Sequence, residues 1–230
     1  FDGITDTGET NRLDDDSDDD GLLDGTEDAN SNNVVDPTET NPLVWDTDGD
    51  TLSDGLESGL NAPEGNNTTS ATFVADDDIS TTTSPYDRDS DDDGLNDNTE
   101  DLDANGVVDG TETNPNLFDS DSDGLGDGLE KGVATAPSTD TNSSIFVSDA
   151  DGGTTTTDPL DDDSDDDGLT DGQEDVDKEG DYDNNETDPN DSDSDGDGID
   201  DDTEDVNNNN DPSDDNTDGD AFINGRDDDD

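Results

Sequence analysis

The chain has 230 residues and a formal net charge of −71 at pH 7, because 76 Asp and Glu face only 5 Lys and Arg, and 20% of its residues are hydrophobic. So little apolar surface cannot offset the conformational entropy of ordering the chain, which excludes a fold held by an ordinary hydrophobic core. The charge excludes nucleic-acid binding, and the lack of a run of about 18 apolar residues excludes insertion into a membrane.

The residue types that remain point to one kind of ligand chemistry. With no Cys and no His in the chain, disulfides and ordinary zinc, copper or iron sites are excluded. Carboxylates, Asn amides and backbone carbonyls are oxygen ligands, which suit hard cations, and a dense flexible array of them favours calcium. We therefore predict multiple bound Ca²⁺ ions as the cofactor.

Residues 1–15 contain the second half of a twelve-residue acidic pattern and the linker that follows it. In full the pattern reads Asp-x-Asp-x-Asp/Asn-Gly, an apolar residue, x, Asp, x, x, Glu, and it recurs along the chain. This is the pattern of a twelve-residue calcium loop. Positions 5, 9 and 12 are filled here by Asp2, Asp6 and Glu9.

Each position of the pattern has a physical reason. Side chains at positions 1, 3 and 5 converge on one ion when the backbone curls, and Gly at position 6 permits the left-handed turn that tightens the curl. Position 7 offers its carbonyl, position 9 a side chain or a water, and Glu at position 12 is long enough to bind through both oxygens.

Residues 16–57 form the first calcium-loop unit, with a tandem pair of loops, a linker and a single loop. Loop 16–27 matches in full, whereas Asn33 and Thr51 replace Gly at position 6 of loops 28–39 and 46–57. Asn tolerates left-handed geometry better than Thr, so of these two loops we expect loop 46–57 to be the more distorted. The predicted ligands are Asp16, Asp18, Asp20, Asp24, Glu27, Asp28, Asn30, Asn32, Asp36, Glu39, Asp46, Asp48, Asp50, Asp54 and Glu57.

Thr-rich inserts follow at residues 58–88 and again at 131–162. In each, a β-branched and aromatic segment (72–74 and 145–147) precedes an acidic turn and a run of Thr, which predicts a short β-hairpin. Such hairpins are marginal alone, so they would pack on the calcium loops or pair with another molecule. A flexible Ser/Thr linker is the alternative.

The unit recurs at residues 89–130 and 163–204, with a period of 73 to 74 residues between equivalent loops. Five of its loops match in full and loop 175–186 is degenerate. The predicted ligands of the second unit are Asp89, Asp91, Asp93, Asp97, Glu100, Asp101, Asp103, Asn105, Asp109, Glu112, Asp119, Asp121, Asp123, Asp127 and Glu130. Those of the third are Asp163, Asp165, Asp167, Asp171, Glu174, Asp175, Asp177, Glu179, Asp183, Glu186, Asp193, Asp195, Asp197, Asp201 and Glu204.

Residues 205–230 contain degenerate loops and a C-terminal half loop. The predicted ligands are Asn216, Asp218, Asp220 and Asp227, followed by Asp228 and Asp230 at positions 1 and 3 of a further copy. Joined to Asp2, these last residues complete a full match. We hypothesise that a calcium loop shared across a subunit junction assembles copies head to tail into a filament. A longer chain with a 230-residue period and chance in an acidic tail are the alternatives.

The loops resemble the thrombospondin type-3 repeat and the related acidic calcium-binding repeats of bacterial surface proteins, and each single loop is similar to that of an EF-hand. Glu27 is followed at once by Asp28, and Glu100 by Asp101, which leaves no room for the helix pair of an EF-hand. The resemblance implies a chain wrapped around a file of ions. The expected fold is a calcium-scaffolded repeat with little regular secondary structure, EF-hand-like loops without helix pairs, and short β-hairpins in the inserts.

We expect a non-enzymatic, extracellular or cell-surface structural protein that is the repeating unit of a calcium-stabilised filament. A monomeric calcium-stiffened stalk or adhesion module of a bacterial surface protein is the alternative. A disordered ion buffer fits the composition but does not require Gly at position 6, and a glycosidase would need a defined cleft that this composition can hardly build.

Overall fold

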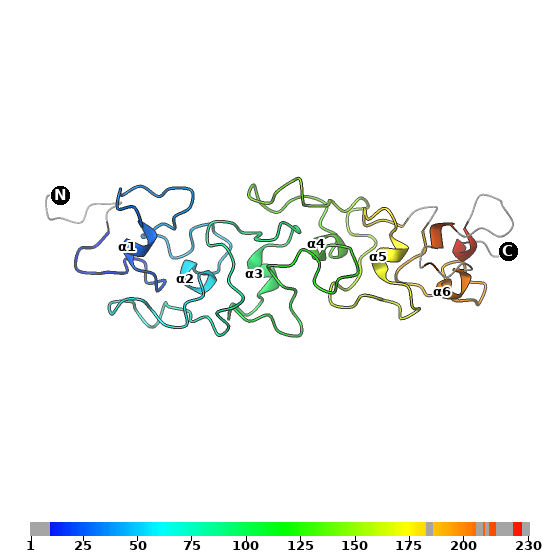
Figure 1. The fold of residues 1–230 in the computed structure, drawn as a ribbon, viewed down its shortest axis with the longest axis horizontal. Helices are drawn as coiled ribbons and strands as arrows, with labels where there is room; N and C mark the ends of the chain where they lie inside the picture. The colour runs from blue at the N-terminus through cyan, green and yellow to red at the C-terminus, as the bar shows by residue number, and fades with distance from the viewer. Residues whose placement is uncertain (1–9, 183–185, 206–208, 210–211, 215–222, 227–230) are drawn as a thin grey trace. The chain divides into compact units, whose positions relative to one another are not determined.

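The computed structural model describes residues 10–182, 186–205, 209, 212–214 and 223–226. Regular structure is sparse, and Figure 1 shows isolated helical turns joined by long irregular segments. The α-helices are α1 (Asp24–Glu27), α2 (Asp54–Glu57), α3 (Asp97–Glu100), α4 (Asp127–Glu130), α5 (Asp171–Glu174) and α6 (Asp201–Glu204). Two 3₁₀ turns follow, η1 (Pro212–Asp214) and η2 (Asn224–Arg226). None of these helices is long and apolar enough to cross a membrane.

The β-hairpins predicted in the inserts are wrong, because the described residues contain no β-strand. In the first insert the amides of Thr72 and Phe73 both donate to the carbonyl of Thr69, at 2.9 and 3.2 Å. In the second, the amides of Ile145 and Phe146 donate in the same way to Asn142. These donors are used within a tight local turn, so they are not available to a strand ladder. The sparse regular structure otherwise agrees with the expectation.

Each α-helix is a single turn that occupies positions 9–12 of a calcium loop. The residue at position 8 is extended, as in Leu23 with φ −84° and ψ 143°, and it precedes the first helical residue. The amide of the residue that follows Glu donates back to the carbonyl at position 9, for example Asp28 to Asp24 at 3.1 Å. The sequence prediction placed no helix here, since a four-residue turn leaves no hydrophobic period to read.

The chain divides into two compact units. The first comprises residues 1–91 and 96–116, and the second residues 92–95 and 117–230. Helices α1, α2 and α3 belong to the first unit and α4, α5 and α6 to the second.

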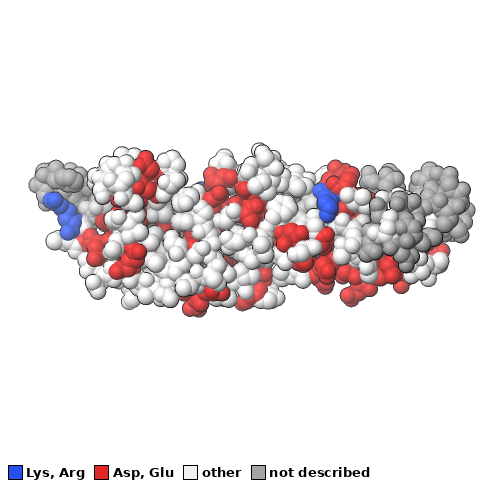
Figure 2. Space-filling model, in the orientation of Figure 1, with Lys and Arg blue, Asp and Glu red and all other residues white. Residues whose placement is uncertain are grey.

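The interior of both units is acidic rather than apolar. The buried hydrophobic residues are few and are mostly Leu at position 7 of a loop, such as Leu22 and Leu169. The largest fully buried side chains are instead nearly all carboxylates, including Glu100, Glu174 and Asp16. On the face drawn in Figure 2, acidic side chains accordingly form separate patches among uncharged residues instead of one continuous acidic surface. Because Asp and Glu are almost never fully buried unless paired, this interior requires a partner for its charges.

Candidate metal centre

The described loops fall into two structural classes. Six loops carry a helical turn at positions 9–12, and we call them primary loops: 16–27, 46–57, 89–100, 119–130, 163–174 and 193–204. The other three follow a primary loop directly, and we call them satellite loops: 28–39, 101–112 and 175–186. Loops 28–39 and 101–112 have no helical turn, whereas positions 9–11 of loop 175–186 lie outside the described residues. Loop 46–57, which was expected to be distorted, is primary, whereas the full match at 101–112 is a satellite loop.

The backbone of every one of these loops turns in the same way. Position 6 is left-handed throughout, from Asn33 at φ 59° to Gly168 at φ 112°, and Thr51 has φ 90°. Position 4 is left-handed as well, for example in Asp19 at φ 65° and Ser122 at φ 73°, and sequence reasoning missed this. Two left-handed residues flanking position 5 curl the segment tightly, which keeps the side chains of positions 1, 3 and 5 on the inside.

Local hydrogen bonds hold the inward carboxylates by one oxygen. In loop 16–27 the amide of Gly21 donates to Asp16 Oδ2 at 3.1 Å, and the amide of Leu22 donates to Asp20 Oδ1 at 2.7 Å. The same bonds recur in loop 163–174, from Gly168 to Asp163 and from Leu169 to Asp167. Each bond fixes the orientation of a carboxylate, and in loop 16–27 the second oxygens, Asp16 Oδ1 and Asp20 Oδ2, accept no hydrogen bond.

Position 9 is held by position 2 in all six primary loops. The amide and the hydroxyl at position 2 donate to the two oxygens of the Asp at position 9, with Oγ–Oδ2 distances of 2.6–2.9 Å. The donors are Ser17, Thr47, Ser90, Ser120, Ser164 and Ser194. Sequence reasoning missed them, although the signal is visible: the satellite loops have Ala29, Leu102 and Val176 at this position.

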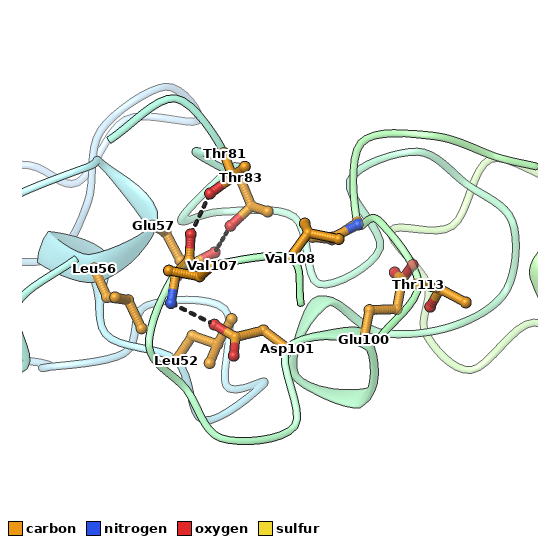
Figure 3. A pocket seen from close by; sticks show the side chains of 12 residues that line it. Leu52, Leu56, Glu57, Thr81, Thr83, Glu100, Asp101, Val107, Val108 and Thr113 are labelled. Carbon is orange, nitrogen blue, oxygen red and sulfur yellow. Dashed lines mark hydrogen bonds between the residues drawn. The ribbon is translucent and has the colours of Figure 1, made fainter. Parts of the chain in front are cut away.

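The linkers join the Glu of one primary loop to position 2 of the next primary loop. Thr40 Oγ1 donates to Glu27 Oε1 at 3.1 Å, and the amide of the next residue, Asn41, donates to Thr47 Oγ1 at 2.8 Å. Thr83 donates likewise to Glu57 Oε1 at 3.2 Å, a bond that is drawn in Figure 3. Thr40 and the residue that follows it therefore connect the Glu of the preceding primary loop, Glu27, to position 2 of the next primary loop, Thr47.

Carboxylates converge both within loops and between successive primary loops of the first unit. Asp16, Asp18 and Asp20 can bring one oxygen each to within 4.8 Å of one another, and so can Asp46, Asp48 and Asp50. Two further groups with the same spacing combine neighbouring loops, and every member of these is buried: Asp20, Glu27 and Asp54, and Asp50, Glu57 and Asp97. Asp20 and Asp50 thus take part in two groups each.

Burial and mutual repulsion disfavour the charged form of these carboxyl groups. Burial, followed by the carboxylates of Asp18 and Asp20, raises the pKa of Glu27 to about 9. Burial together with Asp48 and Asp50 raises the pKa of Glu57 to about 10. In the second unit, burial with Asp121 and Asp123 raises the pKa of Glu130 to about 9. Without a cation, the carboxyl groups of Glu27, Glu57 and Glu130 would stay protonated at neutral pH.

The oxygens that local bonds leave over fit a hard cation. Asp16 Oδ1, Asp20 Oδ2 and Glu27 Oε2 are buried and accept no hydrogen bond. In two other primary loops the same holds for Asp48 Oδ2 with Glu57 Oε2, and for Asp121 Oδ2 with Glu130 Oε2. A buried carboxylate oxygen without a donor is costly, and several that point into one space are the ligand set that calcium takes.

The satellite loops satisfy their Glu differently. In loop 101–112 the amides of Leu102 and Asp109 donate to the two oxygens of Glu112, at 2.9 and 3.1 Å. In loop 28–39 the side-chain amide of Asn30 donates to both Asp36 and Glu39. In these two loops, donors within the loop therefore satisfy the Glu carboxylate. In loop 28–39 the side chains of Asn30 and Asn32 are also exposed.

Some predicted ligands lie outside the described residues. These are Asp2, Asp6, Glu9, Asp183, Asn216, Asp218, Asp220, Asp227, Asp228 and Asp230. The split loop on which the filament hypothesis depends is among them.

Comparison with known proteins gives no relative: no protein-family model, no curated protein and no solved structure matches the chain. The likeness to thrombospondin type-3 repeats therefore rests on the loop pattern alone.

Proposed function

We propose that the chain is a calcium-binding structural protein in which Ca²⁺ ions inside the primary loops take the place of a hydrophobic core. The observation that carries the proposal is the set of buried carboxylate oxygens without donors, such as Asp16 Oδ1, Asp20 Oδ2 and Glu27 Oε2. All are oxygen ligands, and the chain holds only 5 Lys and Arg to compensate its acidic residues. Calcium suits such flexible, oxygen-rich sites better than magnesium, which demands near-ideal octahedral geometry.

A structural role follows from how the loops are connected. Successive loops share carboxylates and are joined through the linker Thr residues, so each bound ion would order two neighbouring loops. Extracellular calcium, at about 10⁻³ M, keeps even weak carboxylate sites filled. We therefore place the protein outside the cell or on its surface, as a calcium-stiffened spacer or scaffold.

The proposal is tested by calcium titration of the full chain with a chelator control. Native mass spectrometry and isothermal titration calorimetry should count at least six ions, one for each primary loop. Circular dichroism and a thermal melt should show that ordered structure depends on calcium, and magnesium at equal concentration should support it less. A chain whose spectrum and melting temperature do not change on calcium removal would refute the proposal.

A further inference from the structure

Each Thr-rich insert folds back over calcium-loop residues that precede it in the sequence. Insert 58–88 covers loop 16–27, within the first unit. Insert 131–162 repeats the contacts on residues 92–95, within the second unit. The equivalent contacts are 73 residues apart, so they belong to the repeat and not to one copy of it.

The main contact is an aromatic ring over the Gly at position 6. A Cβ atom on Gly21 would lie 2.5 Å from Cε2 of Phe73, so only Gly leaves room for the ring. Phe146 covers Gly94 in the same way. Both rings are half-buried, and Leu60 and Val133 lie near the same two glycines, Gly21 and Gly94 respectively. Glycine is therefore needed here for its lack of a side chain as well as for its left-handed backbone.

Hydrogen bonds from the insert reach the calcium loop around this ring. Thr68 Oγ1 donates to Asp16 Oδ2, and the amide of Thr69 donates to Asp19 Oδ1 at 2.6 Å. The amide of Asn142 donates to Asp92 Oδ1 at 2.6 Å in the second copy. The first insert thus touches a candidate calcium ligand directly, through Asp16 Oδ2, and leaves Asp16 Oδ1 without a hydrogen bond.

Other primary loops have different covers. Arg88 lies near Gly49 of loop 46–57, and Lys178 Nζ donates to the carbonyl of Gly124 at 2.8 Å. In loop 193–204 no described residue comes within 4 Å of a Cβ placed on Gly198, and Asp197 at position 5 is exposed. By contrast Asp20, at position 5 under the first insert, is fully buried. Within the part of the chain that the structure describes, loop 193–204 therefore serves as a reference loop without a cover.

We propose that the inserts are retention straps, which slow the exit of calcium from the loops they cover. An ion can leave only when its ligands swing outward and water enters, and the ring of Phe73 with the bonds from Thr68 and Thr69 opposes both movements. The strap acts on the opening of the loop, so it lowers the rate of calcium release. This inference rests on the proposed calcium binding and adds two kinetic classes of site to it.

The test is the rate of calcium release from the full calcium-loaded chain, followed by stopped flow with a fluorescent chelator. The wild type should release calcium in at least two phases. Phe73→Ala combined with Phe146→Ala should speed the slow phase about tenfold or more and leave the number of bound ions unchanged. The matched control is Ile79→Ala with Ile145→Ala, because these residues are 59% and 45% exposed in the same inserts. It should release calcium as the wild type does.

A milder variant keeps the test valid if the Ala substitutions disturb folding. Thr68→Val preserves the shape of the side chain and removes only the donor to Asp16, so it should speed part of the slow phase. Calcium binding with a single release rate, or unchanged slow release in the Phe and Thr68 variants, would overturn the inference alone. A chain that binds no calcium would overturn the proposed function as well.

Discussion

Glu57 shows how a single residue depends on its surroundings. One of its oxygens accepts a hydrogen bond from Thr83, and the other is buried with no donor beside Asp48 and Asp50. The side chain is therefore favourable only where a cation offsets the repulsion. Removing the cation from such a buried site leaves an uncompensated charge, which lowers the stability of the fold.

Glu57→Gln should consequently have opposite effects with and without calcium. With calcium we expect the loss of about one bound ion and a lower melting temperature, by about 2–4 °C for each kcal/mol lost. In chelator the variant should melt above the wild type, because a neutral amide does not have to take up a proton on folding, whereas burial raises the pKa of Glu57 to about 10. Differential scanning calorimetry in both conditions measures this, with the exposed Asp140→Asn as control. Equal shifts of one sign in both conditions would contradict the assignment.

Ser164 is a second residue whose role is specific. Its hydroxyl donates to Asp171 Oδ2 at 2.7 Å and accepts from the amide of Asp158 at 3.2 Å. Ser164→Ala should lower the free energy of unfolding by about 1–3 kcal/mol, because Asp171 loses a donor in a buried position. Chemical denaturation in calcium measures this, and Ser143→Ala at an exposed insert position should change it by less than about 0.5 kcal/mol. A similar small change for both would argue against the position 2 to position 9 bond.

At the scale of elements, successive primary loops approach through position 10. A Cβ atom on Gly55 in α2 would collide with the backbone carbonyl of Asp20, and one on Gly128 in α4 would collide with that of Asp93. The amide of Gly128 also donates to Asp93 Oδ2 at 2.9 Å. A clash with a backbone carbonyl cannot be relieved by a side-chain movement, so Gly at position 10 permits the close approach of these two pairs of loops.

Gly55→Ala and Gly25→Ala should therefore differ in sign. Gly55→Ala should destabilise the calcium-loaded chain by about 1–3 kcal/mol through overpacking. Gly25 occupies the same position in α1, where no described residue lies within 4 Å of an added Cβ, so Gly25→Ala should be neutral or stabilising by up to about 1 kcal/mol. Thermal melts in calcium compare the two directly. A stabilised Gly55→Ala variant would show that the loops do not pack in this way.

The sequence predicted these elements unevenly, for identifiable reasons. The ligand spacing is local, so the pattern alone locates the loops that the structure describes. The prediction of β-hairpins failed although residues 72–74 and 145–147 have high β propensity. Backbone amides in these segments close a local turn, and their Phe rings cover a Gly that is distant in the sequence. The distinction between primary and satellite loops depends on bonds between positions 2 and 9, and only comparison of Ser17 with Ala29 would have suggested it.

For the whole molecule, the change of stability with pH should have opposite signs in the absence and in the presence of calcium. The pKa values of Glu27, Glu130 and Glu174 are raised from 4.5 to about 9 by burial and neighbouring acidic groups. A raised folded-state pKa stabilises the fold below the unfolded value, and this stabilisation is lost as pH rises through the folded value. The calcium-free chain should therefore be most stable near about pH 4–5 and lose stability toward pH 9.

Calcium should reverse this trend, because the ligands must be deprotonated to bind it. Melting temperatures measured from pH 4 to pH 9, with calcium and with a metal-free buffer, should give curves of opposite slope. Parallel curves would contradict a shared role of these carboxyl groups in proton and metal binding.

Charge repulsion should also control the size of the calcium-free chain. At a net charge of −71 the chain should expand when calcium is removed, and about 1 M monovalent salt should partly reverse the expansion by screening. Size-exclusion chromatography with light scattering measures the hydrodynamic radius in each condition. A radius that does not respond to the chelator would refute calcium as the source of compaction.

The carboxylates of Asp20 and Asp50, which each belong to two groups, have a mechanical consequence. Load applied to the chain would be resisted by a series of nearest-neighbour junctions, so rupture of one would weaken the next without releasing all of them. A pulled molecule would then lengthen in successive small steps. Each step would free one primary loop with the satellite loop and linker, or the insert, that follows it, about 10–15 nm of extended chain. In metal-free buffer the same molecule would stretch smoothly, as an entropic spring that recovers its resistance when calcium returns.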